Sequence, residues 1–325
     1  MRWIFLLCLI VVGSVQAAPR TFEEAKTASK QYVYYDQNTS AMGDLYCGCK
    51  WNWVGKSGGR MNLGDCGYTP RTNADRAARM EWEHIVPAST FGRQRQCWQN
   101  GGRENCNRTD PTFNVMEADM HNLYPSVGEV NGDRSNFNYG MALNLPNQYG
   151  MCRTKVDFKG RAAEPRAEAK GIAARVTFYM YDRYGLRMSA QQEQMFMAWN
   201  NAFPVTAWER ERNARITKIM GVTNPFVTGQ KVWTRNYRPT GGNDVSAQEI
   251  YQRPNAAAPV PVIPAGPAVA PPSGGVPIVG NRNSQIYHIY GHCPSYNDVS
   301  PSNRIVFVSE QQAINSGYRK AKNCR

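Results

Sequence analysis

Residues 79–89 read Arg79-Met80-Glu81-Trp82-Glu83-His84-Ile85-Val86-Pro87-Ala88-Ser89. The large apolar side chains of Trp82, Ile85 and Val86 favour a strand. Proline does not continue a central strand, so the pattern predicts a strand that enters a turn at Pro87. Successive side chains of a regular strand point to opposite faces, so Glu83 and His84 are expected to have different neighbours. One can then bind a metal while the other transfers a proton. Alone, such a pair favours a salt-bridged glutamate beside a surface histidine, and the rest of the chain changes that interpretation.

The N-terminus has the pattern of a secretory signal. Arg2 precedes an apolar run that starts at Trp3, and small residues follow it. This order predicts a signal peptide at residues 1–18. The run is too short for a membrane-spanning helix and no later run is long enough, so we expect no membrane span. Removal of Cys8 would leave an even number of the nine cysteines, which is typical of a disulfide-bonded protein that is periplasmic or secreted.

The chain is strongly basic. Its 38 Lys and Arg residues outnumber 25 Asp and Glu residues, which gives a formal net charge of +13 at pH 7. An exported basic protein can bind a polyanion, such as nucleic acid, envelope polysaccharide or a membrane surface. Charge alone does not choose among these partners, so it is supporting evidence only.

Two polar segments after residue 90 are predicted to be loops. Residues 93–111 carry four arginines, and a Cys97–Cys106 bond would close a short loop and hold Arg103 in place. Arginine suits phosphate binding because its planar fork matches phosphate oxygens, although a solvated basic loop fits the same pattern. Residues 128–136 are rich in short polar side chains that can present oxygens, and loops often carry function.

Other segments have the patterns of helices. Thr21 and Glu24 have the spacing of a capping box, which predicts a helix through about Asp36. Apolar spacing over residues 113–123 indicates a helix or a tight extended turn. Three more helices, expected to be the packing scaffold, are predicted at residues 162–184, 189–203 and 205–220. The charges of the last one are expected on a solvated face: Arg210, Arg212, Arg215 and Lys218.

The C-terminal part is expected to form a linker and a small module. Residues 239–280 are rich in proline and alanine with almost no charge, so we expect them to be extended and without a core. Residues 281–325 have the pattern of two strands and a short helix. The role of this module is left open, with a contact to nucleic acid or to the cell surface as alternatives.

The cysteine spacing predicts several disulfides. Cys47 and Cys49 are separated by one glycine and are poorly placed to bond each other, so each is expected to pair elsewhere. Cys293 and Cys324 are expected to form a disulfide in an oxidising compartment. A less favoured alternative is a zinc site in which these two cysteines act with His288 and His292.

Five residues between positions 83 and 131 supply the groups that phosphodiester hydrolysis needs. The reaction requires a base for water, a cation near the scissile oxygens and a charge partner for the product phosphate. These residues are Glu83, His84, Arg103, Glu117 and Asn131.

Four motifs resemble the endonuclease I family of periplasmic and secreted nonspecific nucleases. They read Glu81-Trp82-Glu83-His84-Ile85-Val86-Pro87-Ala88, Gly101-Gly102-Arg103-Glu104-Asn105-Cys106, Met116-Glu117-Ala118-Asp119-Met120-His121-Asn122-Leu123 and Gly128-Glu129-Val130-Asn131-Gly132-Asp133-Arg134. The resemblance covers about residues 20–235. It implies an α+β fold class, with a ββα-metal (His-Me finger) active site inside a mixed domain that we place at residues 19–238.

The resemblance also implies a role for each of the five residues. His84 would be the general base that activates water, a task that suits imidazole. Glu83 and Asn131 would hold one Mg²⁺ ion, for which Mn²⁺ or Ca²⁺ can substitute in binding. Arg103 would hold the phosphate after cleavage, and Glu117 would lie near the base and the metal. His121 is the nearest competitor for the base, but its apolar-spaced surroundings favour a structural histidine.

The leading hypothesis is a monomeric, Mg²⁺-dependent endonuclease that cuts DNA, and RNA as well, without sequence preference and leaves 5′-phosphates. The second hypothesis is a noncatalytic polyanion-binding envelope protein on the same fold. A zinc hydrolase is disfavoured, because the nuclease region has no His-x-x-x-His or comparable ligand cluster.

Overall fold

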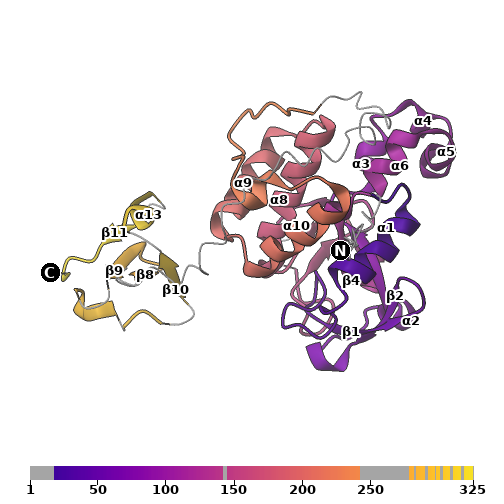
Figure 1. The fold of residues 1–325 in the computed structure, drawn as a ribbon. Coiled ribbons are helices and arrows are strands. Elements are labelled where there is room, and N and C mark those ends of the chain that lie inside the picture. The colour runs from indigo at the N-terminus through magenta and orange to yellow at the C-terminus, as the bar shows by residue number, and fades with distance from the viewer. Residues whose placement is uncertain are drawn as a thin grey trace, which may run out of the picture. The chain divides into compact units, whose positions relative to one another are not determined.

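A computed structural model describes residues 18–141, 145–241 and 278–324, the last range without 282, 290, 291, 297, 301, 302, 308, 309, 316 and 317. The chain divides into two compact units, Met1–Ala256 and Ala257–Arg325, here called the N-terminal and the C-terminal unit. The expected signal peptide, except residue 18, and most of the expected linker lie outside the described residues. Both units combine helices with sheets (Figure 1), so the fold is mixed α+β, as predicted.

A four-stranded antiparallel sheet carries the decisive segment. Its strands, in the spatial order β1-β2-β3-β4, are β1 (Lys50–Val54), β2 (Gly58–Asn62), β3 (Arg79–His84) and β4 (Leu123–Val127). Glu83 pairs with Tyr124 and His84 with Leu123 across β3 and β4. The strand ends at His84, and Pro87 is the N-cap of the next helix. The predicted strand and its turn are therefore confirmed.

Short helices also occur in the first half of the N-terminal unit. They are α1 (Phe22–Ala28), η1 (Ser29–Val33), η2 (Gly64–Cys66), α2 (Ala74–Ala77), α3 (Ala88–Gly92), α4 (Gln96–Gln99), α5 (Gly102–Thr109), α6 (Pro111–Glu117), η3 (Met120–Asn122) and α7 (Gly128–Arg134). The helical alternative for residues 113–123 is confirmed by α6 and η3. The loops predicted at 93–111 and 128–136 were wrong, because α4 and α5 occupy the first segment and α7 the second.

The polar residues of those two segments have protein partners, which explains the wrong prediction. Arg95 donates to Asp110 through both Nε and Nη2, the latter at 2.9 Å. On α7, Glu129 accepts the backbone N–H groups of Thr72 at 2.7 Å and Asn73 at 2.6 Å. The polar side chains of these two segments therefore form hydrogen bonds within the protein, and a helix can present such side chains as well as a loop can.

The first helix follows the predicted start but not the predicted length. Thr21 is the N-cap of α1, and its Oγ1 accepts from the Glu24 N–H at 3.2 Å. The Glu24 carboxylate accepts from the N–H of Arg20 at 2.7 Å, so the second bond of the capping box goes one residue further back. The α-helix changes to a π-helical turn at Ser29 that ends at Val33, short of the expected end at Asp36.

Three long helices form the predicted scaffold. They are α8 (Ala167–Tyr184), α9 (Ala190–Ala202) and α10 (Ala207–Met220), followed by the short α11 (Pro225–Thr228). Figure 1 shows α8, α9 and α10 grouped together. The segment before α8 forms a small sheet, in the order β5-β7-β6, from β5 (Asn138–Tyr139), β6 (Lys155–Asp157) and β7 (Ala162–Glu164). Residues 162–164, expected to begin the helix, are therefore extended.

Two arginines of α10 are not on a solvated face, which corrects that expectation. Arg212 is 3% exposed, and its Nη2 donates to the carbonyl oxygens of Met120 at 2.7 Å and Leu123 at 2.8 Å. Arg215 forms a two-pronged pair with Asp36, at 2.7 and 2.8 Å. Arg212 thus anchors the start of β4, the strand that supports Glu83 and His84.

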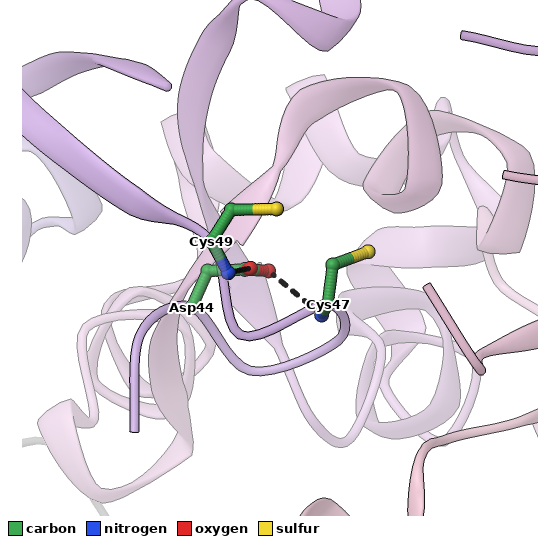
Figure 2. A group of neighbouring side chains, drawn as sticks. All are labelled: Asp44, Cys47 and Cys49. Carbon is green, nitrogen blue, oxygen red and sulfur yellow. Dashed lines mark hydrogen bonds between the residues drawn. The ribbon is translucent and has the colours of Figure 1, made fainter. Parts of the chain in front are cut away.

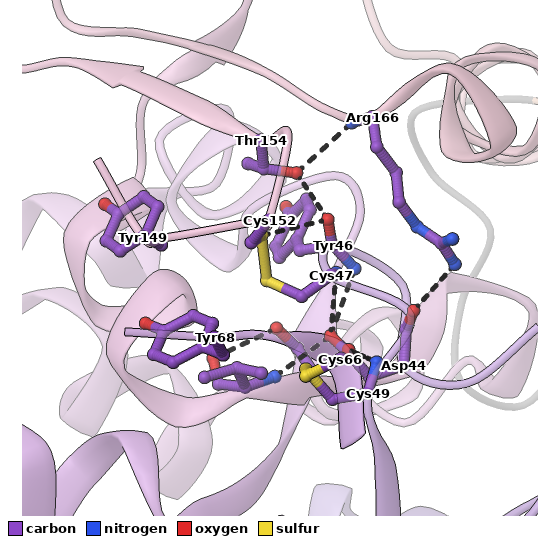
Figure 3. Close-up of a disulfide and its surroundings, with 12 residues drawn as sticks. Asp44, Tyr46, Cys47, Cys49, Cys66, Tyr68, Tyr149, Cys152, Thr154 and Arg166 are labelled. Atoms are coloured by element: carbon purple, nitrogen blue, oxygen red, sulfur yellow. Dashed lines mark hydrogen bonds between the residues drawn. A yellow bond between two sulfur atoms is a disulfide. The ribbon is translucent and has the colours of Figure 1, made fainter. Parts of the chain in front are cut away.

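All eight cysteines of the described residues form disulfides. The pairs are Cys47–Cys152, Cys49–Cys66, Cys97–Cys106 and Cys293–Cys324. Figure 3 shows the first two pairs next to each other. The separate partners expected for Cys47 and Cys49 are confirmed, as are the other two predicted bonds. The alternative zinc site is wrong, because the sulfurs of Cys293 and Cys324 are bonded to each other.

The C-terminal unit has a sheet and a core of its own. Its elements are β8 (Ile278–Asn281), β9 (Ile286–Ile289), η4 (Pro294–Tyr296), β10 (Arg304–Phe307), α13 (Glu310–Asn315) and β11 (Arg319–Lys320). The strand order is β10-β8-β9-β11. Strand β8 begins at Ile278, whereas the module was expected from residue 281. In neither unit does a described helix have the length and apolar character needed to span a bilayer.

Candidate active site

A cavity of about 630 Å³ lies at the end of β3 in the N-terminal unit. Four of the five predicted site residues border it: Glu83, His84, Arg103 and Asn131. Strand β3 supplies the first two, α5 supplies the arginine and α7 supplies the asparagine. Glu117, at the end of α6, does not border the cavity, but it contacts both His84 and Arg103, which do. The fold therefore gathers all five residues in one place.

The ring of His84 is held in a single tautomer. Its Nε2 lies 2.9 Å from the backbone carbonyl oxygen of Glu117. A carbonyl oxygen can only accept, so Nε2 carries the hydrogen and Nδ1 is left with a free lone pair. The ring of Phe22 covers the imidazole, with 4.7 Å between the ring centroids. Burial, with the nearby charge of Arg103, lowers the pKa of His84 to about 3. The imidazole is therefore neutral, and able to accept a proton, at neutral pH.

Glu83 is a buried carboxylate with two donors on the same oxygen. It is 2% exposed, and Oε1 accepts from Tyr46 Oη at 2.5 Å and from Arg134 Nη1 at 2.6 Å. Burial raises the pKa of Glu83 above its ordinary value, and the charge of Arg134 opposes that rise. Among the described residues, both hydrogen bonds end on Oε1. The other carboxylate oxygen is therefore available to a ligand in the cavity.

Asn131 is oriented through its nitrogen. Its Nδ2 donates to Oε2 of Glu81 at 3.0 Å. The amide oxygen Oδ1 is consequently the end that a ligand can use. A carboxylate oxygen from Glu83 and an amide oxygen from Asn131 fit a hard divalent cation, and the cavity has room for the waters that Mg²⁺ retains.

Arg103 is joined to Glu117. Its Nε lies 2.5 Å from Oε1 of Glu117, and 47% of the arginine side chain is exposed. The guanidinium also lies 5.6 Å from the ring centroid of Phe22. Glu117 thus acts twice: its carbonyl oxygen holds His84, and its carboxylate holds Arg103.

A second group of possible metal ligands does not fit a metal. Asp44, Cys47 and Cys49 place a carboxylate oxygen and two sulfurs within 4.8 Å of one another (Figure 2). Both sulfurs are bonded in disulfides. The Asp44 carboxylate accepts the backbone N–H of Cys49 at 2.8 Å and of Val127 at 3.1 Å. Asp44 therefore closes a turn against β4.

The competing histidine lies elsewhere. His121 is 1% exposed, its Nε2 lies 2.8 Å from the carbonyl oxygen of Val222, and its ring packs on Tyr179. It does not border the cavity. It is a buried histidine with a hydrogen-bond partner, as its apolar surroundings predict.

Sequence reasoning missed four residues that support the site. Glu81 could have been found, since it lies two positions before Glu83 on one strand, and such residues share a face. The others had no recognisable signal, because they lie far from β3 in the sequence or in a segment interpreted as a loop: Phe22, Tyr46 and Arg134.

Residues 21–230 match the family model described as Endonuclease I. The chain belongs to the endonuclease I family. It is 51% identical over 229 residues to a periplasmic deoxyribonuclease of Aeromonas hydrophila, covering 69% of this chain and 92% of that protein. It is 44% identical over 230 residues to an extracellular deoxyribonuclease of the same species, covering 70% and 98%. It is 47% identical over 212 residues to Endonuclease-1 of Buchnera aphidicola subsp. Acyrthosiphon pisum (strain APS), covering 64% and 84%.

Family membership confirms several expectations. The protein is an endonuclease, and it is periplasmic or secreted, as the names of these relatives indicate. Nucleases of this family use a divalent metal ion. The family match ends at residue 230, before the C-terminal unit begins.

Proposed function

We propose that this endonuclease hydrolyses DNA without sequence preference, with one Mg²⁺ ion and with water activated by His84. The observation that carries the proposal is the bond from Nε2 of His84 to the Glu117 carbonyl, which leaves Nδ1 as the acceptor atom of a residue that borders the same cavity as Glu83 and Asn131. The deoxyribonuclease names of the relatives support DNA as the substrate. RNA remains the expected second substrate, since both polymers present phosphodiesters.

His84 would act as the general base. Nδ1 accepts a proton from water as the oxygen attacks phosphorus, and the positive charge that forms on the ring is stabilised by the Glu117 carbonyl at Nε2. The bond between phosphorus and the 3′-oxygen breaks, and the leaving 3′-oxygen takes a proton from solvent water. The low pKa of about 3 in the free protein keeps the ring neutral, so Nδ1 carries no proton. The negative charge of a bound phosphodiester would raise that pKa and ease proton transfer.

Glu83 and Asn131 would hold the metal ion through one oxygen each. When bound, Mg²⁺ supplies Lewis-acid polarisation of the scissile phosphate. Tyr46 and Arg134 fix the Glu83 carboxylate through hydrogen bonds to its Oε1. A ββα-metal site is the arrangement that these residues and the β3–β4–α7 elements support, with the 5′-phosphate products that the family resemblance implies.

Arg103 would neutralise the phosphate after cleavage. Its guanidinium borders the cavity and nearly half of the side chain is exposed, so it can reach an anion. Lys26 borders the same cavity. Contacts of this kind go to the backbone of nucleic acid and carry no sequence information, which supports nonspecific cleavage. The five residues come from one chain, which supports action as a monomer.

A plasmid-nicking assay tests the proposal. Supercoiled plasmid should be nicked with Mg²⁺, not with EDTA, and again after excess Mg²⁺ is restored. Cleavage that persists after thorough chelation would contradict the metal requirement. DNA retention without any cleavage under all metal conditions would instead favour the noncatalytic polyanion-binding protein.

A further inference from the structure

We infer that Glu81 is a positioning residue that determines which end of the Asn131 amide faces the active-site cavity. The inference rests on the proposed role of Asn131 as a metal ligand. The two ends of an amide have nearly the same shape, yet only the oxygen can bind a cation. A metal site built on asparagine therefore needs a partner that distinguishes nitrogen from oxygen.

Glu81 makes this distinction by charge. Its Oε2 lies 3.0 Å from Nδ2 of Asn131. An ionised carboxylate has no hydrogen to donate, so it accepts from the amide nitrogen and repels the amide oxygen. A flipped Asn131 would place two oxygens at this distance. The contact thus keeps Oδ1 away from Glu81 and free for the cavity, which both residues border.

Glu81 is itself held in place by Arg76 of α2. Nε of Arg76 lies 3.0 Å from Oε1 and Nη2 lies 2.8 Å from Oε2 of Glu81. Such two-pronged pairs fix the plane of the carboxylate.

Two glycines of α7 allow this arrangement. A Cβ atom at Gly132, next to Asn131, would lie 2.2 Å from Nη1 of Arg76. A Cβ atom at Gly128 would lie 2.9 Å from Oε1 of Glu81 and 2.5 Å from the carbonyl oxygen of Arg76. Arg76 and Glu81 therefore pack directly on the helix that carries Asn131.

A direct metal-ligand role for Glu81 is the competing explanation. Arg76 already bonds both of its oxygens, which favours positioning. The two roles predict different Mn²⁺ affinities for a variant that lacks both Glu81 and Asn131. A residue that acts only through Asn131 has no effect once Asn131 is removed, whereas an independent ligand adds its own effect.

A double-mutant cycle on metal binding tests the inference. Mn²⁺ binding to the full-length protein, without DNA, would be measured by the electron paramagnetic resonance signal of free Mn²⁺. The variants are Glu81→Ala, Asn131→Ala and the double variant. The matched control is Asp36→Ala, which removes another two-pronged partner of an arginine, Arg215, outside this cavity.

We expect Glu81→Ala to weaken Mn²⁺ affinity by about 10-fold, the lower end for residues that orient metal ligands. The double variant should match Asn131→Ala alone, and Asp36→Ala should match the wild type. Glu81→Gln, which retains an acceptor oxygen and the side-chain volume, should restore part of the affinity. Glu81→Leu, which keeps most of the volume without an acceptor oxygen, replaces Glu81→Ala in the cycle if that variant does not fold.

The outcomes separate this inference from the proposed function. Unchanged affinity in Glu81→Ala, with weakened affinity in Asn131→Ala, would overturn only the positioning role. Multiplicative losses in the double variant would also overturn it and make Glu81 an independent ligand. Unchanged affinity in Asn131→Ala would overturn the proposed metal ligand itself.

Discussion

Nε2 of His84 lies 2.9 Å from the backbone carbonyl oxygen of Glu117. The side chain of Glu117 makes a separate contact, to Arg103. The proposed base and the proposed phosphate-binding cation are thus held by two different parts of one residue. Mutation can separate them, because a substitution at position 117 changes the carboxylate and keeps the carbonyl.

Glu117→Ala should impair the function of Arg103 and spare that of His84. A hydrogen bond to a charged group contributes about 1.5–3 kcal/mol, so we expect about a 10-fold loss of cleavage. The measurement is single-turnover cleavage by Glu117→Ala, Arg103→Ala and the double variant. The double variant should match Arg103→Ala. A loss in Glu117→Ala as large as that of His84→Ala, in a folded protein, would instead place the carboxylate in the base step.

The disulfides should differ in what they control. Cys97–Cys106 closes 9 residues and holds the helix of Arg103, whereas Cys47–Cys152 closes 105 residues. Loop-closure entropy grows with loop length, so loss of the second should destabilise the protein more. Paired Cys→Ser variants would be compared by urea unfolding and by cleavage. For the same loss of unfolding free energy, we expect Cys97→Ser/Cys106→Ser to lose more cleavage activity than Cys47→Ser/Cys152→Ser. An equal ratio of activity loss to stability loss in the two paired variants would contradict this.

Much of the site was predictable because its chemistry lies in short motifs. The strand at residues 79–84 follows from its large apolar side chains, and the five candidate site residues follow from the family resemblance. The prediction failed for the surroundings of polar residues. Arg212 was expected on a solvated face and Glu129 in a loop, yet their partners are backbone atoms far along the chain. Hydrophobic periodicity cannot distinguish water from such internal partners.

Stability should fall in acid through buried His121. Burial lowers its pKa to about 4, whereas an unfolded histidine has a pKa of about 6.5. Between these values the unfolded state binds a proton that the folded state excludes, so the free energy of unfolding falls as pH falls. The slope approaches about 1.4 kcal/mol per pH unit for one such proton. The stability that neutral His121 contributes is fully lost only below about pH 4.

Urea unfolding at several pH values between 7 and 4 checks this prediction. His121→Asn should be less stable at pH 7 but should have a shallower pH dependence than the wild type. His292→Asn, at an exposed position in the C-terminal unit, should keep the wild-type dependence. Equal slopes in His121→Asn and the wild type would show that another group causes the acid effect.

The C-terminal unit should affect long DNA more than short DNA. Its described exposed cations are Arg319, Lys320 and Lys322. The deletion should begin at residue 257, because the Thr240 N–H binds the Asp182 carboxylate at 2.8 Å. A tethered unit acts by raising local concentration, so turnover on short oligonucleotides should stay close to that of the full chain.

Salt dependence distinguishes the partners of that unit. If it contacts phosphates, the slope of log affinity against log salt should fall on deletion by about 0.9 for each phosphate lost on duplex DNA. Binding to long DNA should weaken most at low salt. The same slope for both proteins would mean that the unit contacts something other than nucleic acid, such as the cell envelope.

The most direct test of the account is His84→Ala, assayed for cleavage and for DNA binding on the same preparation. Loss of a general base lowers a rate by about 10²–10⁴-fold, and the side chain is not needed to hold the phosphate backbone. Single-turnover cleavage with Mg²⁺ should therefore fall by at least that factor, while DNA affinity measured by fluorescence anisotropy stays within about twofold of the wild type. A folded variant that loses binding in proportion to cleavage, or that still cleaves at the wild-type rate, would contradict His84 as the base.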